Sequence, residues 1–361
     1  MSRSYEIALL PGDGIGPEVM DSALAVLKQT AQLDDLNFTY TEYEAGANYY
    51  QKSGMSISPE SMEAVGKADA VLLGAMGLPS VRKPDGTEIA PQIDMREHYG
   101  LFASLRPCHL LEGVPTRTKA TDVKMLVIRE LTEGLFAGRH DVQPDSDESM
   151  SDRLTITRAT SEKLFELAFD QAKQRRAKYG TPGHVTLLDK ANVLRSNAFL
   201  RKVFDDVAKR HPSIGSDRIY IDAGSMMFVT NPERYDVVVT ENVFGDITSE
   251  IAAGVVGGLG VAPSADVSAT HAVFQPSHGT APDIAGKGIA NPVAMILSTV
   301  MMLEWLSEKH QDLYLLAASK RIRSATEAAL KDGVLTGDLG GKASTSDVTS
   351  AIIERLEQFN G

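Results

Sequence analysis

Cysteine is almost absent from this chain of 361 residues, in which Cys108 is the only one. A single cysteine excludes an intrachain disulfide and favours a reducing compartment. The sequence also lacks any run of about 18 uninterrupted apolar residues, which excludes a membrane-spanning helix. Its first apolar run, Ile7 to Leu10, is too short for the core of a secretory signal. We therefore expect a cytoplasmic protein with no membrane partner.

Basic residues are outnumbered, with 36 Lys and Arg against 48 Asp and Glu and a net charge of -12. A nucleic-acid binder needs clustered Lys and Arg to neutralise phosphates, so we expect no nucleic-acid partner. Hydrophobic residues make up 43% of the chain and charged residues 23%, which excludes broad disorder. At about 100–200 residues per domain, the length favours two domains.

Short apolar runs alternate with amphipathic stretches along the chain. The alternation predicts an α/β sheet with helices on its faces. The predicted strands are Tyr5–Leu10, Asp69–Gly74, Val123–Ile128, Val185–Leu188, Arg218–Ile221 and Tyr235–Thr240. The predicted helices are Glu18–Leu33, Ser161–Lys178, Ser196–Arg210, Ala290–Lys309 and Asp312–Asp332, of which the last two close the chain.

A glycine-rich segment, Leu10-Pro-Gly-Asp-Gly-Ile-Gly-Pro-Glu18, separates the first predicted strand from the first predicted helix. Glycine permits turns and close backbone approaches that a Cβ would block. The spacing differs from G-x-G-x-x-G, and no acidic strand end follows about 20 residues later, so the dinucleotide-binding fingerprint is not met. The segment is either a phosphate-binding loop or a tight strand–helix turn.

Two carboxylates lie four residues apart in Asp246-Ile-Thr-Ser-Glu250. Positions i and i+4 share one face of a helix. Carboxylate oxygens so placed suit Mg²⁺ or Mn²⁺, and Asp222, after a predicted strand, is a candidate third ligand. The alternative is an exposed acidic helix start that the helix dipole favours.

Three arginines occur in apolar surroundings, namely Arg96, Arg106 and Arg129. Each guanidinium alone is explained by an ion pair, but three together suggest a site for a dicarboxylate, which arginine binds with two parallel hydrogen bonds.

Lys190 follows a predicted strand among apolar residues. It is either a general base whose pKa is lowered by its surroundings or an ordinary lysine at a strand end.

A second glycine-rich segment spans residues 274–292 and precedes a predicted helix. It combines Gly279, Gly286 and Gly288 with His278 and Asp283. Backbone amides at a helix start can hold a phosphate, and an Asp can bind ribose hydroxyls while repelling a 2′-phosphate. The segment therefore favours NAD over NADP.

Six segments occur in an order that resembles the metal-dependent β-decarboxylating dehydrogenases of the isocitrate/isopropylmalate dehydrogenase family. The resemblance covers essentially the whole chain. Overall, the sequence is most similar to the family members that oxidise 3-isopropylmalate. The segments are Pro11-Gly-Asp-Gly-Ile-Gly-Pro-Glu18, Leu105-Arg-Pro107, Arg129-Glu-Leu-Thr-Glu-Gly134, Asp189-Lys-Ala-Asn-Val-Leu194, Asn242-Val-Phe-Gly-Asp-Ile247 and His278-Gly-Thr-Ala-Pro-Asp-Ile-Ala-Gly-Lys-Gly-Ile-Ala-Asn-Pro292.

The resemblance implies a two-domain, isopropylmalate dehydrogenase-like α/β fold that is not a true Rossmann fold. Residues 1–103 and 257–361 would form a larger domain carrying most of the NAD site. Residues 104–256 would form a middle domain with metal ligands and a homodimer interface. The implied reaction oxidises a (2R)-malate-type 2-hydroxy diacid with NAD and then releases CO₂.

The resemblance also assigns roles to individual residues. The substrate would be held by Arg96, Arg106, Arg129, Gln92 and Ile93. Mg²⁺ or Mn²⁺ would be bound by Asp222, Asp246 and Glu250. Catalysis would use Lys190, as acceptor of the hydroxyl proton, and Asp222, both serving the active site of the partner subunit. NAD would be bound by His278, Gly279, Asp283, Ile284 and Asn291.

The chain departs from the family pattern at several positions. Phe136 stands where the family usually has a Tyr that helps to protonate the enol product, and Tyr99, His98 and His140 are candidate replacements. Glu250 replaces an Asp, and Gln275 replaces the usual Glu before a Pro.

The segment before Arg96 bears on the substrate's C3 substituent. Gln92 stands where isopropylmalate enzymes have a pocket leucine, and an unpaired buried amide costs about 1–3 kcal/mol. We expect 3-isopropylmalate, with D-malate, tartrate or another 3-substituted malate as alternatives. An alternative from another class is a ligand-binding homologue that turns over poorly because of Phe136.

Overall fold

The computed structural model describes residues 4–140 and 148–359, the side chain of His140 excepted. The chain forms two compact units: the first comprises residues 1–99, 111–117 and 257–361, and the second residues 100–110 and 118–256. The predicted domains, 1–103 with 257–361 and 104–256, stay a prediction, because compact units do not by themselves show that each part folds alone.

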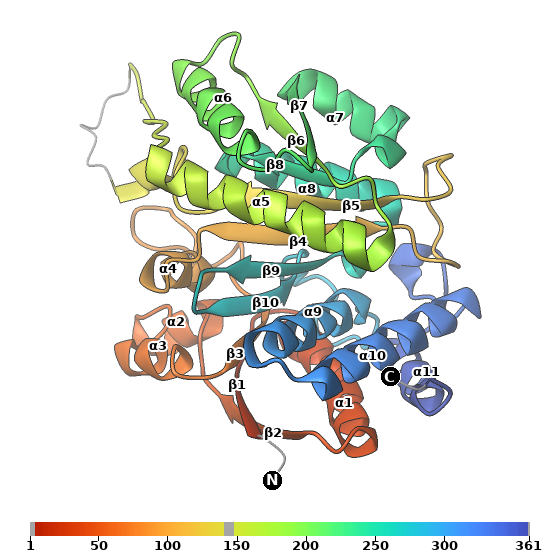
Figure 1. Ribbon diagram of the computed structural model, residues 1–361. Helices are drawn as coiled ribbons and strands as arrows, with labels where there is room; N and C mark the ends of the chain where they lie inside the picture. The colour runs from red at the N-terminus through yellow and green to blue at the C-terminus, as the bar shows by residue number, and fades with distance from the viewer. Residues whose placement is uncertain (1–3, 141–147, 360–361) are drawn as a thin grey trace. The chain divides into compact units, whose positions relative to one another are not determined.

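Five strands of the first unit lie in the order β2-β1-β3-β10-β9 (Figure 1). They are β1 (Ser4–Gly12), β2 (Asn37–Glu42), β3 (Ala70–Ala75), β9 (Pro263–Val267) and β10 (Ala272–Pro276). β1, β2, β3 and β10 pair in parallel, whereas β10 and β9 pair antiparallel. This order and the antiparallel pair differ from a Rossmann sheet, which has parallel strands in another order. The predicted α/β class is confirmed.

The helices of the first unit pack on this sheet and on one another. α9 (Val293–His310) contacts β9 and β10, and α1 (Gly16–Leu33) contacts α9 and α11 (Thr345–Leu356). The other helices are α2 (Ala47–Ser53), α3 (Pro59–Val65), α4 (Pro91–His98) and α10 (Leu313–Lys331). The prediction that two helices close the chain was wrong, because α11 follows. A capping box between Ser344 and Asp347 begins that helix.

Asp13 gives the glycine-rich segment at residues 10–18 a structural role. Its buried carboxylate accepts hydrogen bonds from the backbone N–H groups of Ala47, Asn48 and Gly77, at 2.7, 2.8 and 2.9 Å. Gly14 has a φ of +58°, and a Cβ there would lie 2.0 Å from the carbonyl oxygen of Thr280. The segment is thus a tight turn that joins loops within the first unit.

The second unit also contains five strands, in the order β4-β5-β8-β6-β7. They are β4 (Ala103–His109), β5 (Lys124–Glu130), β6 (His184–Asp189), β7 (Gly215–Tyr220) and β8 (Val237–Thr240). β4 and β5 are antiparallel, and the other pairs are parallel. The helices are α5 (Arg158–Tyr179), α6 (Arg195–Ala208), α7 (Ile221–Thr230) and α8 (Asn242–Val256). α5 lies on one face of the strands and α8 on the other (Figure 1).

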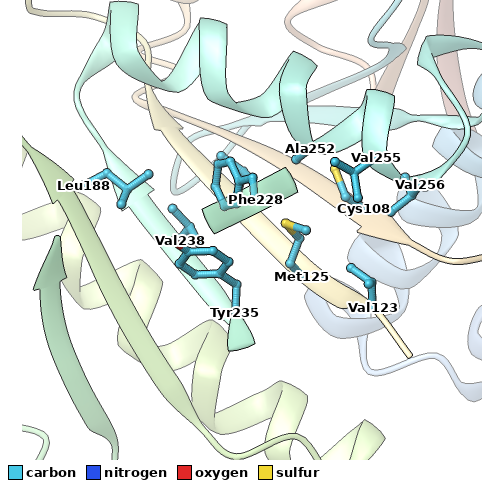
Figure 2. Close-up of a cluster of buried hydrophobic side chains, with 11 residues drawn as sticks. Cys108, Val123, Met125, Leu188, Phe228, Tyr235, Val238, Ala252, Val255 and Val256 are labelled. Atoms are coloured by element: carbon cyan, nitrogen blue, oxygen red, sulfur yellow. The ribbon is translucent and has the colours of Figure 1, made fainter. Parts of the chain in front are cut away.

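An apolar core lies between α8 and the strands of the second unit (Figure 2). Met125 of β5 packs with Phe228 of α7 and with Ala252 and Val255 of α8. Cys108 belongs to the same cluster and is 2% exposed. Burial raises the pKa of its thiol to about 12, so the thiolate that reacts with oxidants and alkylating agents is scarce at neutral pH.

Most predicted strands and helices appear, with ends shifted by a few residues. At one strand the shift changes the type of element: the strand predicted at Arg218–Ile221 ends at Tyr220, and Ile221 is the first residue of α7. Within residues 4–140 and 148–359, no helix has the length and apolar character that crossing a membrane requires.

Candidate active site

Arg96 is held on α4 by an acidic side chain from β9. Its Nε donates to Asp266 Oδ2 at 2.9 Å, and the two side chains are 8% and 2% exposed. Gln275 Nε2 donates to the same oxygen at 3.1 Å. The two terminal nitrogens of Arg96 make no hydrogen bond to any residue that the structure describes. Two parallel donors are therefore left for a carboxylate.

Gln92 lies one turn before Arg96, on the same side of α4. Its Oε1 is buried and has no hydrogen-bond partner within residues 4–140 and 148–359. Ile93 is partly buried beside it. An unpaired buried amide oxygen is costly, so this position favours a hydrogen-bond donor next to it.

Tyr99 and His98, two candidate replacements for the family tyrosine, face α3 instead of Arg96. The Tyr99 hydroxyl donates to the carbonyl of Met62, and its ring stacks on His271 with centroids 5.1 Å apart. His98 Nε2 lies 3.3 Å from Glu63. Burial raises the pKa of Tyr99. Both side chains are thus occupied by their own unit; the side chain of His140 lies outside the described part of the chain.

Arg106 and Arg129 are brought together with Asp246 in the second unit. Arg106 Nη1 donates to Ser249 Oγ at 3.0 Å, and its Nη2 lies 3.8 Å from Asp246. Arg129 donates from Nε and Nη2 to Asn242 Oδ1, at 3.0 and 2.8 Å, and from Nη1 to Asp246. Arg106 Nε is buried without a partner among the described residues. Two buried guanidinium groups thus lie beside one partly exposed carboxylate, a combination that favours a nearby anion.

Phe136 lies over this cluster. Its ring centroid is 5.4 Å from the Arg129 guanidinium carbon, a distance at which the ring face attracts the cation. A phenyl ring carries no proton to donate. Phe136 therefore fixes Arg129 but does not perform acid chemistry.

Asp246 and Glu250 lie one turn apart on α8, as their spacing predicts. The Asp246 side chain is 42% exposed, and Glu250 is also exposed. Within the described ranges, no group of three or more His, Cys, Asp or Glu side chains is arranged to hold a metal ion. One chain thus brings two of the three predicted ligands together.

Lys190 and Asp222 form a pair of their own in the second unit. Lys190 Nζ lies 2.9 Å from Asp222 Oδ1, with the side chains 27% and 69% exposed. The hydrogen bond from Lys190 lowers the pKa of Asp222. The backbone N–H of Lys190 donates to Asn197 Oδ1 at 2.9 Å, and the neighbouring Asp189 accepts two bonds from Arg201 at 2.7 Å. The hydrogen bonds of Asn197 and Arg201 therefore hold the backbone at residues 189 and 190 in place.

A cavity of about 450 Å³ lies within the first unit. His278 lines it: Nδ1 lies 2.9 Å from the carbonyl of Gly279, and Nε2 is buried without a partner among the described residues. Because a carbonyl only accepts, Nδ1 carries the proton and Nε2 is an acceptor. Burial lowers the pKa of His278, which favours this neutral ring. The lining residues are Ile15, Gly260, His278, Ile284, Ile289, Asn291, Gly337, Asp338, Lys342 and Ala343.

Three of the five predicted cofactor residues line this cavity, namely His278, Ile284 and Asn291. Gly279 supplies the carbonyl that orients His278, and Asp283 is exposed outside the lining. The sequence reasoning missed Asp338, which accepts from Asn291 Nδ2 at 3.0 Å, and Lys342. The signal for both was present in the glycine-rich segment Gly337-Asp-Leu-Gly-Gly-Lys342.

Comparison with known proteins identifies the family. Residues 6–352 match the model of the isocitrate/isopropylmalate dehydrogenase family. The chain is 40% identical to 3-isopropylmalate dehydrogenase of Archaeoglobus fulgidus and 38% identical to 3-isopropylmalate/3-methylmalate dehydrogenase of Methanocaldococcus jannaschii, covering 98% of this chain and 99% of each relative. It also resembles the crystal structure of isocitrate dehydrogenase from Methylococcus capsulatus, with a TM-score of 0.84 and 35% identity over 98% of this chain and 100% of that one. The chain therefore belongs to the isocitrate/isopropylmalate dehydrogenase family and is a decarboxylating dehydrogenase.

Proposed function

We propose that the protein catalyses NAD-dependent oxidative decarboxylation of a (2R)-malate-type 2-hydroxy diacid, with 3-isopropylmalate as the first expected substrate. The observation that carries the proposal is the identity of 37–40% to 3-isopropylmalate dehydrogenases over 98% of the chain. The buried arginines support it chemically, because guanidinium groups bind carboxylates with paired hydrogen bonds. We assign each of Arg96, Arg106 and Arg129 to the binding of a substrate carboxylate.

The residues around the cavity of the first unit fit NAD. Its size, its apolar Ile15, Ile284 and Ile289, and the unpaired acceptor His278 Nε2 suit a nucleotide with exocyclic N–H donors. Gly279 and Asn291 would complete this site. Asp283 would face ribose hydroxyls, and its charge would disfavour a 2′-phosphate. When bound, NAD supplies the hydride acceptor.

The donor set on α8 fits Mg²⁺ or Mn²⁺, since Asp246 and Glu250 offer exposed carboxylate oxygens. Asp222 of a second subunit would be the third ligand. Such a metal, when bound, supplies an electrophile for charge on the substrate's oxygens. Asp246 is paired with Arg129, so that pairing also orients the carboxylate.

A homodimer with shared active sites follows from this assignment. α7 and α8 expose apolar side chains, with Met226, Val229 and Ile247 at 57%, 60% and 57%. Exposed apolar groups on adjacent helices are typical of an interaction surface. Lys190 and Asp222 would then serve the site of the other subunit. We expect sedimentation of the purified protein to give the mass of a dimer.

The chain's own groups divide the reaction between them. Lys190 would accept the proton of the substrate's hydroxyl, directly or through water. Arg106 and Arg129 would hold the carboxylates in a setting from which water is largely excluded. Phe136 donates no proton, so the enol product would receive its proton from another group or from solvent. We place these events in the cytoplasm, with no nucleic-acid or membrane partner.

A second candidate substrate class is D-malate, whose C3 is unsubstituted, tartrate or another 3-substituted malate. The unpaired Oε1 of Gln92 favours the members of this class with a polar group at C3. A hydroxyl at C3 would donate to that oxygen, whereas an isopropyl group would leave it unpaired.

A substrate panel tests the proposal. The purified enzyme is supplied with NAD and Mn²⁺ and with 3-isopropylmalate, D-malate, the tartrates, isocitrate or 3-methylmalate, and NADH formation is followed. Preference for 3-isopropylmalate supports the first assignment, and preference for a hydroxylated or unsubstituted diacid supports the second. Tight binding of NAD and diacid without NADH from any of them would favour a poorly active ligand-binding homologue and overturn both.

A further inference from the structure

Asp266 and Gln275 lie on the same face of the antiparallel pair formed by β9 and β10. Ser264 pairs directly with Gln275, and Asp266 follows Ser264 by two residues, so its side chain emerges on the side of Gln275. The two are diagonal neighbours in the pair, close enough for their side chains to interact. Gln275 Nε2 donates to Asp266 Oδ2 at 3.1 Å.

The Asp266 carboxylate is almost completely buried, with 2% of its side chain exposed. A buried carboxylate requires nearby donors, and its contacts come from the side chains of Arg96 and Gln275. Its other oxygen, Oδ1, has no hydrogen-bond partner among the residues described. The orientation of Asp266 therefore depends on these two neighbours.

Arg96 uses only its inner nitrogen, Nε, for this contact. A guanidinium is planar, so fixing Nε against a carboxylate fixes the directions of the two terminal nitrogens as well. These nitrogens are the ones without a partner in the described part of the chain. Asp266 thus binds Arg96 at Nε, and the two terminal nitrogens of Arg96 are left for another ligand.

We infer that Asp266 and Gln275 are positioning residues that orient Arg96 toward a carboxylate of the substrate. The inference rests on the proposed function, since that assigns Arg96 to the substrate. It also explains the amide at position 275: an ionised Glu there would set a second negative charge about 3 Å from Asp266, and both could not stay ionised in a buried place.

Three variants test the inference: D266N, Q275E and the double variant D266N/Q275E. D266N removes the carboxylate that holds Arg96, and Q275E adds a second one. Each single change is expected to weaken diacid binding about 10–100-fold, the effect of a small misplacement of a binding group. The double variant returns one carboxylate and one amide to the cluster and is expected to recover at least tenfold.

A second buried ion pair serves as a matched control. Arg175 Nε donates to Asp236 Oδ1, also at 2.9 Å, with side chains 6% and 1% exposed. This pair lies in the second unit, between α5 and the start of β8, and holds none of the proposed substrate groups. D236N should lower the unfolding midpoint in urea as D266N does, but leave diacid affinity within about twofold.

The diacid dissociation constant is measured by calorimetry, alongside KM, kcat and the NAD dissociation constant. A selective loss of diacid affinity in D266N and Q275E, with recovery in the double variant and NAD affinity unchanged, supports the inference. Equal effects of D266N and D236N on diacid affinity, or no recovery in the double variant, would overturn it. Failure of the proposed function is distinguishable, because it appears in the wild type as absent NADH formation.

Discussion

The two compact units hold their charged groups in different ways. In the second unit, Arg106, Arg129 and Asp246 come from β4, β5 and α8 and form ion pairs, with Arg106 Nε left without a partner among the described residues. In the first unit, the polar groups of the cavity come from loops, and His278 Nε2 lacks a partner among the described residues. A paired cluster on regular elements is rigid before a ligand arrives. A loop-built cavity with an unpaired acceptor gains hydrogen bonds only when a ligand arrives.

This difference predicts separable effects. Changes at the arginine cluster of the second unit should act on turnover, because they disturb the groups that we propose hold the diacid. Changes at the cavity of the first unit should act on cofactor affinity. A change that lowered turnover and cofactor affinity equally would contradict this difference.

Arg129→Lys should have the largest effect. Lysine keeps the charge but loses the planar fork that contacts Asn242 and Asp246 at once. We expect kcat/KM to fall about 10³-fold, which corresponds to about 4 kcal/mol. Arg210→Lys, a change at an arginine that is 48% exposed beside Glu166, should leave kcat/KM within about twofold. Steady-state kinetics of both variants measures the contrast, which similar kcat/KM values would refute.

His278→Asn should have a smaller effect, confined to the cofactor. Loss of the Nε2 acceptor is expected to weaken NAD binding about tenfold, close to the free energy of one hydrogen bond. Protonation would turn that acceptor into a donor, so wild-type NAD affinity should also fall as the pH drops through the pKa of His278, which burial holds below its usual value of about 6.5. Fluorescence titration with NAD from pH 5 to 8 should show this fall in the wild type and a flat profile in the variant. A change in the diacid dissociation constant would contradict the assignment.

The lowered pKa of His278 also predicts how the free energy of unfolding changes with pH. Burial lowers its pKa in the folded state, so the unfolded chain binds more protons between that lowered value and about 6.5. The stabilisation is therefore present above about pH 6.5 and is lost as the pH falls toward the lowered pKa. Urea unfolding across this range should show a shallower pH slope for His278→Asn than for the wild type.

Cys108 gives the smallest effect and tests the core of the second unit. With its pKa raised to about 12, the thiol should not react with an aromatic disulfide reagent in the folded protein at neutral pH and should react once the protein is unfolded in urea. Cys108→Ser places a hydroxyl in the apolar cluster and should cost about 1–3 kcal/mol of unfolding free energy. Rapid labelling of the folded protein would show that this core opens more readily than its packing implies.

The fold was predictable where a strand is a nearly continuous run of apolar residues. β3, β5, β6 and β8 are continuous apolar runs, and each was predicted. β9 and β10 were missed because Pro263, Asp266 and Gln275 interrupt their apolar pattern. Asp266 is explained by its contact with Arg96, which lies 170 residues away in the sequence, and Gln275 by its hydrogen bond to Asp266. No local pattern reports a partner at that distance.

The candidate site was predictable to the same extent. Asp246 and Glu250 were placed on one helix by their spacing, and β4 and β5 set Arg106 and Arg129 in one sheet. Asp338 lies in a glycine-rich segment, but nothing local links that segment to Asn291, its partner 47 residues away. The roles of all these residues remain proposals that follow from geometry and resemblance.

The most direct test of the central claim is the ratio of NADH to CO₂ formed in one reaction with Mn²⁺ and the preferred diacid. We expect one CO₂ for each NADH, because Phe136 stands at the position that the resemblance assigns to reprotonation and not to the release of CO₂. NADH without matching CO₂ would contradict oxidative decarboxylation and leave an enzyme that stops at the 2-oxo acid.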